Sequence, residues 1–303
     1  MHFYVPNLFE LYSSGDRIND LCFFICTKRE CENQYPLKKY VTGTEKKYTY
    51  EIVNDIKVPE FFELKYRWFY VNKSVVYYRR NVMGIPLKFS YDSNSGKMFV
   101  NRFYHHLIKF ELGNIWPSGK VLSNFICNDL QKVGYGIFHG VSFKKDGCTF
   151  CLFAPGGNYK TSLVKKLLSS GACYIAEDKV VLKDCKSFFV PTVSGSEIKY
   201  SNIALSSSID YVIFANLSDR NELCKDLSVE DIDTYLDIYN VFNFLGKGWA
   251  LNALQLYEKH AQPKSWYENL KLSHVKGFYR LSFKDIIYME ECINKLIGAK
   301  EDE

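Results

Sequence analysis

Length, composition and charge set the first bounds on this chain. Its 303 residues, 47% of them hydrophobic, are enough for one large domain or two smaller ones with a substantial core. A formal net charge of +5 is mild for this length, so no nucleic-acid partner is expected. No apolar run approaches the ~18 residues of a membrane-spanning helix. Ten cysteines without a secretory leader favour a reducing cytoplasm. We therefore expect a cytoplasmic protein with no membrane partner.

Residues 1–116 are predicted to form a β-rich region of unknown role. Runs of aromatic and β-branched residues bounded by turn residues are typical of strands. Such runs cover residues 66–71, 74–78, 85–89 and, after a turn at 92–96, 97–100. Two runs, near residues 66–70 and 77–80, mix aromatic with basic side chains. We interpret them as an ordinary sheet face and leave open a surface that stacks on a nucleic acid or a peptide.

A second domain is predicted over residues 117–303. The sequence Trp-Pro-Ser-Gly at 116–119 marks the boundary, and Ser118 can cap a helix that runs to about Lys132. Short apolar runs at 134–141 and 148–153 then predict two strands with a turn between them.

A glycine-bearing loop follows the apolar strand at 148–153. In the pattern G-x-x-x-x-G-K-[S/T], backbone N–H groups point at phosphate oxygens, the Lys reaches the β and γ phosphates, and the Ser or Thr holds Mg²⁺. Lys160 and Thr161 fit this pattern, whereas its two glycines fall on Ala154 and Tyr159. The alternative is a glycine-rich turn before an ordinary helix.

The segment after the loop favours the phosphate-binding interpretation. Apolar residues at 163–164 and 167–168 form one helical stripe, and Gly171 stands where a helix of this length would end. The helix N-terminus would then lie at Lys160, at a surface-facing helix end where free N–H groups and the helix dipole favour an anion. The next predicted strand ends in two acids, Glu177 and Asp178, and we expect it to run parallel to and beside the strand of the loop.

The cysteines are expected to be structural. Cys148 and Cys151 form one C-x-x-C pair, but they lie inside the strand that leads into the loop, and no second pair accompanies them. Core packing is therefore preferred over a zinc site. Cys22, Cys26 and Cys31 are spaced irregularly, and no metal is expected there.

The C-terminal third is predicted to alternate strand and helix. Residues 211–216 form an apolar run typical of a buried strand. Ser228 and Asp231 are spaced as a capping box at the start of a helix, and residues 283–297 have helical periodicity. The glycines of 242–249 suggest a substrate-side loop.

Taken together, the motifs of residues 130–183 resemble the catalytic core of HPr kinase/phosphorylase. Its relatives include the kinases of lasso-peptide gene clusters and, more distantly, phosphoenolpyruvate carboxykinases. The resemblance rests on His139-Gly140 before the loop, on Lys160-Thr161 and on Glu177-Asp178 after it. Lys160 stands 21 positions after His139, and Glu177 stands 17 positions after Lys160, which matches the family without a gap. The likeness extends loosely over residues 184–298.

The resemblance implies an α/β fold: a phosphate-loop core of the HPr kinase and carboxykinase type, with a mixed sheet and flanking helices, after a smaller β-rich N-terminal region. It also implies an ATP- and Mg²⁺-dependent kinase that phosphorylates a hydroxyl, such as that of serine. Lys160 and the backbone N–H groups of the loop would bind the phosphates. The loop residues implied in this way are Gly156, Gly157, Asn158, Tyr159, Lys160 and Thr161.

The resemblance implies separate roles for the acids and the histidine. Glu177 would take the proton from the acceptor hydroxyl, and it replaces an Asp of the family. Asp178 would complete a Mg²⁺ site with Thr161, and His139 would lie near the transferred phosphoryl group. Glu197 is a candidate for a further metal ligand. The alternative is that His139 is a structural residue and that Glu177-Asp178 is only the polar end of a strand.

The expected partners are a nucleotide and a hydroxyl-bearing peptide, protein or small molecule, and a homo-oligomer is left open. A second hypothesis is a catalytically impaired nucleotide-binding or pseudokinase module that acts through protein partners, because Ala154 and Tyr159 depart from the loop pattern. A third is another phosphate enzyme on the same core, such as a phosphorylase or a carboxykinase-like decarboxylase.

Overall fold

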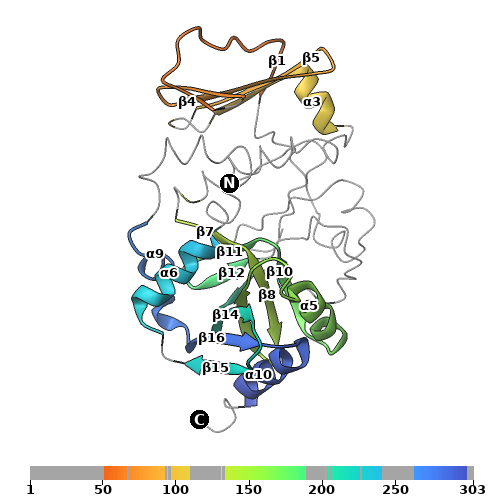
Figure 1. The fold of residues 1–303 in the computed structure, drawn as a ribbon, viewed down its shortest axis with the longest axis vertical. Coiled ribbons are helices and arrows are strands. Elements are labelled where there is room, and N and C mark those ends of the chain that lie inside the picture. Colours follow the sequence, from red (N-terminus) through yellow and green to blue (C-terminus); the bar gives the residue numbers. More distant parts are fainter. Residues whose placement is uncertain are drawn as a thin grey trace, which may run out of the picture.

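The computed structural model describes residues 51–66, 68–92, 94, 97–109, 131, 134–188, 202, 204, 206–225, 227–240 and 263–298. These residues form a mixed α/β structure with three sheets (Figure 1). Several predictions fall outside them: the boundary at 116–117, the helix from Ser118, Glu197, the loop at 242–249, and Cys22, Cys26 and Cys31.

Residues 51–101 form a six-stranded sheet. Its strands in spatial order are β1 (Glu51–Val53), β6 (Lys97–Asn101), β5 (Ile85–Asp92), β4 (Val75–Val82), β3 (Phe69–Asn72) and β2 (Leu64–Tyr66). Helix α3 (Arg102–Lys109) packs on one face, where the Tyr104 ring lies 5.9 Å from that of Tyr78 and 5.7 Å from that of Phe89. The predicted hairpin across residues 92–97 is confirmed by the antiparallel pairing of β5 with β6.

The strand predicted over residues 66–71 is wrong in one respect, because the run is divided between β2 and β3. Tyr66 ends β2, Phe69 begins β3, and the two residues pair directly across the hairpin. The connecting residues include neither Gly nor Pro, so the sequence carries no turn signal at this point.

Residues 54–63, which we name the strap, cross the face of this sheet opposite α3. The strap joins β1 and β2, which lie at opposite edges of the sheet. Asp55 Oδ1 accepts a hydrogen bond from Lys88 Nζ at 2.7 Å, and the Phe62 ring lies 5.2 Å from the Tyr70 ring. Lys88 and Tyr70 of this face therefore contact residues of the strap.

The remaining described residues contain two sheets. The central sheet has the order β10 (Cys173–Glu177), β8 (Gly140–Lys145), β9 (Cys148–Phe153), β14 (Tyr211–Leu217), β16 (Gly277–Phe283) and β15 (Glu222–Lys225), and β9, β14 and β16 are parallel. A smaller antiparallel sheet has the order β13 (Ser206–Ser208), β12 (Lys186–Phe188), β11 (Val180–Lys183) and β7 (Gly136–Phe138).

Helices contribute to separate apolar clusters on the two faces of the central sheet. The helices are α5 (Lys160–Ser169), α6 (Val229–Tyr239), α9 (Trp266–Asn269), α10 (Ile286–Gly298) and a 3₁₀ turn, η2 (Leu272–His274). Helices α5 and α10 pack with Leu152 and Ile213, whereas α6 and α9 pack with Phe153 and Phe214. Because side chains alternate along a strand, these pairs mark the two faces.

The same alternation explains the C-x-x-C pair. Cys148 and Cys151 are both fully buried, and they belong to different apolar clusters on opposite faces of β9. Two side chains on opposite faces of one strand cannot bind the same ion, so the prediction of core packing is confirmed.

The strand carrying the two acids was expected beside the strand of the loop, and this expectation is wrong. β10 is parallel to β9, but β8 lies between them and pairs antiparallel with both. The reason is the tight β8–β9 hairpin, whose turn residues Asp146 and Gly147 both have positive φ angles, 48° and 78°. The hairpin places β8 directly next to β9, and β10 pairs with the other side of β8.

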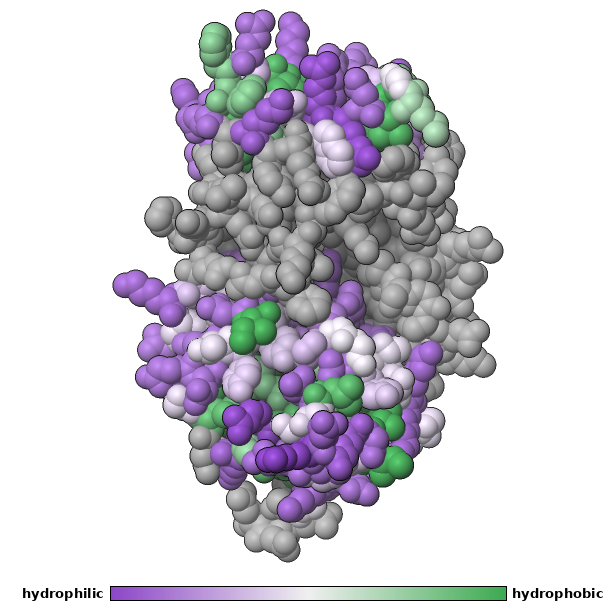
Figure 2. All heavy atoms as spheres, in the orientation of Figure 1, coloured by the Kyte–Doolittle hydropathy of each residue, from purple (hydrophilic) through white to green (hydrophobic). Residues whose placement is uncertain are grey.

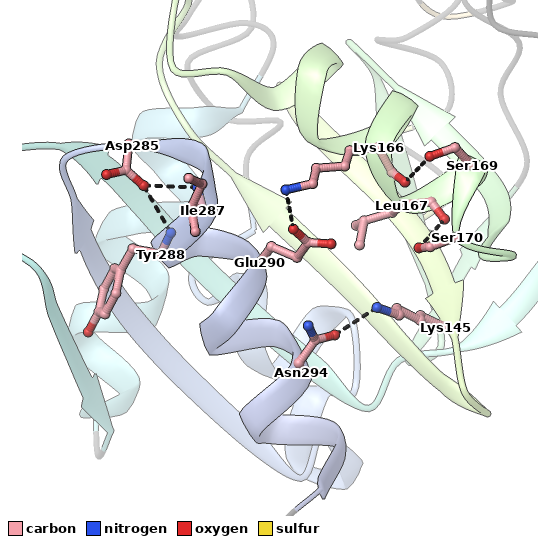
Figure 3. Close-up of polar contacts among 10 residues, drawn as sticks. All are labelled: Lys145, Lys166, Leu167, Ser169, Ser170, Asp285, Ile287, Tyr288, Glu290 and Asn294. Carbon is pink, nitrogen blue, oxygen red and sulfur yellow. Dashed lines mark hydrogen bonds and ion pairs between the residues drawn. The ribbon is translucent and has the colours of Figure 1, made fainter.

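Of the starts of α6 and α10, the first agrees with the sequence prediction and the second differs from it. Helix α6 has the predicted capping box of Ser228 and Asp231. The last helix begins at Ile286 and not at Phe283, which is the final residue of β16. Asp285 accepts hydrogen bonds from the backbone N–H groups of Ile287 and Tyr288 at 2.9 and 3.0 Å, so it caps the helix (Figure 3).

Helix α10 is held to its neighbours by polar contacts at its surface. Lys166 of α5 forms an ion pair with Glu290 at 2.5 Å, and Lys145 of β8 donates a hydrogen bond to Asn294 at 2.7 Å (Figure 3). Among the described residues of the face drawn in Figure 2, hydrophilic ones predominate and apolar ones lie in separate patches. In the described part of the chain, no helix is both long and apolar enough to cross a membrane.

Candidate active site

The loop between β9 and α5 has left-handed residues at two positions, a feature that it shares with backbone concavities that bind anions. Gly157 and Tyr159 have φ angles of 80° and 52°, and helix α5 begins directly afterwards at Lys160. Alternation of left-handed and right-handed residues turns successive N–H groups toward one point. The first hydrogen bond of the helix runs from Leu163 N to Tyr159 O, so the N–H groups of residues 160–162 have no partner inside it.

Tyr159 keeps the left-handed conformation although it is not glycine. Such a conformation costs an L-residue about 1–2 kcal/mol. The residue is 47% exposed, so it is in part open to solvent. The departure from the loop pattern therefore places a bulky side chain and left-handed strain at position 159.

Asn158 fixes the shape of the loop through its side chain. This side chain is buried, and its Nδ2 donates hydrogen bonds to the carbonyls of Pro155 and Gly156 at 3.1 and 3.2 Å. Its Oδ1 accepts a hydrogen bond from the N–H of Leu217, at the end of β14, at 2.7 Å. Sequence reasoning assigned Asn158 only a backbone role, because the partner of its oxygen is 59 residues away.

Lys160 was expected at a surface-facing helix end, and the structure corrects this. Only 8% of the residue is exposed, and Nζ donates hydrogen bonds to the carbonyls of Ala154 and Pro155, both at 2.7 Å. Burial lowers the pKa of Lys160 to about 8, and the nearby Asp178 and Glu177 charges oppose that shift. An ammonium has three N–H donors, so one remains for an anion in the concavity.

The histidine and the two acids lie where the chain passes between two sheets. His139 alone connects β7, in the smaller sheet, to β8, in the central sheet. Asp178 and Lys179 make the reverse connection, from β10 to β11. Because β8 pairs with β10 and β7 pairs with β11, these two connections must lie side by side.

Glu177, the last residue of β10, is only 4% exposed. Burial raises its pKa, and the nearby Thr161 hydroxyl is the main group that opposes the rise. Within the described chain its Oε2 is buried and has no hydrogen-bond partner. A buried carboxylate oxygen without a partner is costly, which marks the position as one that a ligand would satisfy.

Asp178 is paired with His139. The Nδ1 of His139 lies 3.3 Å from Asp178 Oδ1 and 3.2 Å from the Asp178 carbonyl oxygen. The hydrogen bond to His139 lowers the pKa of Asp178. Asp178 itself has a φ angle of 68°, a left-handed conformation that is uncommon outside glycine.

The structure thus brings the predicted site residues to one edge of the central sheet. The loop follows the carboxyl end of β9, and Glu177 is at the carboxyl end of the parallel strand β10. The charges of Glu177 and Asp178 both reach Lys160, since each of them affects its pKa. The loop carbonyls that bind Lys160 and the anchoring N–H of Leu217 were missed, because backbone groups leave no signal in a sequence pattern.

The donor set suits a nucleotide phosphate better than a metal ion bound by protein alone. Across the described ranges, no group of three or more His, Cys, Asp or Glu side chains is gathered closely enough to hold a metal. Magnesium in nucleotide sites is usually held by one or two side chains together with phosphate oxygens and water. Thr161 with an acidic side chain at this edge is sufficient for that arrangement.

Comparisons with known proteins give little beyond this geometry. No family model matches the chain, and no curated protein matches its sequence. Among solved structures, 31 chains match, including the Hpr(Ser) kinase/phosphatase from Coxiella burnetii. That match covers 55% of this chain and 98% of the other, with 8% sequence identity and a TM-score of 0.31. A TM-score this low does not establish a shared fold.

Proposed function

We propose that the chain is an ATP- and Mg²⁺-dependent kinase that transfers the γ-phosphoryl group to a hydroxyl, such as that of serine, on a peptide, a protein or a small molecule. The observation that carries the proposal is the convergence of three features at one sheet edge. These are the N–H concavity of the loop, the buried ammonium of Lys160, and the acids Glu177 and Asp178. Phosphoryl transfer requires chiefly positioning and charge neutralisation, which these groups supply.

In this proposal the loop and Lys160 bind the β and γ phosphates. The N–H groups of residues 156–161 would donate to phosphate oxygens, and the third N–H of Lys160 would do the same. Lys160 is held in place by the Ala154 and Pro155 carbonyls, so its ammonium is positioned before a nucleotide arrives. The α5 dipole adds to the attraction because its positive end faces the concavity.

A divalent cation fits the acidic side of the site. The buried and unpartnered Oε2 of Glu177 provides an anionic oxygen, and Thr161 provides a hydroxyl next to Lys160. When bound, Mg²⁺ would neutralise charge that develops on the phosphates during transfer. The residues of this chain would hold the ion, orient the nucleotide and accept the proton of the acceptor hydroxyl.

The alternative function is a nucleotide-binding module without turnover. It is favoured by two observations, the strained Tyr159 at the glycine position of the loop and the two backbone carbonyls that already bind the Lys160 ammonium. Either feature would slow catalysis if the loop had to rearrange around each nucleotide.

The test is nucleotide binding followed by transfer. We expect ATP with Mg²⁺ to raise the melting temperature of the purified protein, ADP to do so as well, and AMP to have little effect, because the concavity binds the β phosphate. Transfer from γ-labelled ATP to serine-bearing peptides and to protein would then show the kinase. Binding without transfer to any acceptor or to water would favour the module, and no shift at millimolar ATP would contradict both.

A further inference from the structure

We infer that Glu177 and Thr161 together hold the divalent cation, and that the His139–Asp178 pair takes the proton of the acceptor hydroxyl. This division of roles rests on the proposed kinase function. It is the reverse of the one that the family resemblance implies, in which Glu177 is the base and Asp178 a metal ligand. The geometry of this chain separates the two acids into different surroundings.

The surroundings of Glu177 are those of a cation ligand. Only 4% of the residue is exposed, and Oε2 has no hydrogen-bond partner in the described part of the chain. The Thr161 hydroxyl is close enough to influence the carboxyl group. In phosphate-loop NTPases the loop Thr or Ser and an acidic side chain outside the loop hold Mg²⁺. In this chain the acid ends β10, which β8 separates from the strand of the loop. A buried anion that lacks a partner gains most from a bound cation.

The surroundings of Asp178 differ, because its carboxylate already has a partner. His139 Nδ1 faces two oxygen acceptors of the same residue, the Asp178 carboxylate at 3.3 Å and its carbonyl at 3.2 Å. Neither oxygen can donate, so the proton of a neutral imidazole is placed on Nδ1 and the lone pair on Nε2. An acid that orients a histidine through Nδ1 leaves Nε2 as the base. Asp178 is therefore a positioning residue and His139 is the base.

The chemical step balances with these assignments. The acceptor oxygen forms a bond to the γ phosphorus while the bond between that phosphorus and the β–γ bridging oxygen breaks, and ADP leaves with the bond's electron pair. The acceptor proton moves to Nε2 of His139, which becomes an imidazolium beside the Asp178 carboxylate. The imidazolium then releases this proton to water, and the pair returns to its starting state.

The test separates metal binding from turnover in Glu177→Gln and Asp178→Asn. For each variant, ATP affinity is measured by calorimetry with Mg²⁺ and with EDTA, and Mn²⁺ binding in the presence of ADP is measured by electron paramagnetic resonance. We expect E177Q to lose at least tenfold of the Mg²⁺-dependent gain in affinity, and its affinity in EDTA to stay within threefold of wild type. We expect D178N to bind Mn²⁺ normally and to lose turnover by about 10²–10⁴, the usual range for acid–base groups.

A second pair of variants guards against misfolding of a buried substitution. Thr161→Val lies on the exposed start of α5 and should share the Mn²⁺ defect of E177Q, whereas the neighbouring Ser162→Ala should not. Loss of Mn²⁺ binding in D178N with normal binding in E177Q would overturn the inference. If wild-type protein fails to bind ATP at all, the proposed function itself fails, and the two failures are thereby distinguished.

Discussion

At the scale of single residues, Lys160 is the side chain on which nucleotide binding depends most directly. Its ammonium is buried and is fixed by two carbonyls, so it contributes a localised positive charge to the concavity. Hydrogen bonds to charged groups are worth about 1.5–3 kcal/mol. We expect Lys160→Met to weaken ATP binding roughly ten- to a hundredfold, as 1.4 kcal/mol corresponds to a factor of ten.

The control for that variant is Lys225→Met, on the exposed edge strand β15. Both variants remove one positive charge, but only the first removes it from the site. Equal ATP affinities in the two variants, measured by calorimetry after denaturation curves have shown that both are folded, would contradict the assignment of the loop as a phosphate cradle.

The pKa of Lys160, about 8, makes a pH dependence observable. Above this value the side chain loses its charge, so ATP affinity should fall by up to tenfold for each pH unit as pH rises through 8. For stability the sign is opposite. Burial penalises the charged form below pH 8, and this penalty is relieved as pH rises toward the ordinary value of 10.5. Affinity and urea unfolding measured from pH 7 to 10, with Lys160→Met as the reference, should show both trends.

Tyr159 allows the strain of the loop to be tested. Tyr159→Gly should relieve about 1–2 kcal/mol of left-handed strain, partly offset by the greater freedom of glycine in the unfolded chain. We expect the free energy of unfolding to change by less than about 1 kcal/mol and ATP affinity to be unchanged or severalfold tighter. If turnover is lost while ATP binding persists, the exposed ring has a direct role with the base or the acceptor.

At the scale of elements, the packing of α5 on the central sheet matters more than its surface ion pair. Lys166 is 45% exposed in its side chain, and such pairs are usually worth less than about 1 kcal/mol. Leu167, one residue away, is fully buried, and a buried Leu→Ala change costs about 2–5 kcal/mol. Urea denaturation of Leu167→Ala and Lys166→Ala should show this difference. Similar losses in the two variants would mean that the Lys166–Glu290 contact anchors α10.

The elements also show what a sequence can predict. The strand at 148–153, the helix after Lys160 and the capping box at Ser228 depend on local patterns, and all three are present. Two predictions were wrong, because the run at 66–71 is divided between two strands and α10 starts after residue 283. A hairpin turn without Gly or Pro leaves no local signal, and neither does a strand that is followed closely by a helix cap.

At the scale of the whole molecule, the edge of the central sheet explains why the site lies where it does. The chain leaves β9 for α5 on one face of the sheet, and the next helix after β14, α6, lies on the other face. Crevices at such reversals are the usual ligand sites of open α/β sheets. Only the family resemblance could suggest that His139 lies near Asp178, since the contact arises where the chain passes between the two sheets in both directions.

The single-residue connection at His139 also restricts how this chain can change in length. Phe138 is paired with Val180 in one sheet, and Val141 is paired with Glu177 in the other, so the alternation of side chains is fixed on both sides of the histidine. An added residue has no loop to absorb it and would turn one of the two strands inside out, with its buried side chains facing water. The chain can therefore vary around this junction by substitution, while insertions and deletions are confined to longer connections elsewhere.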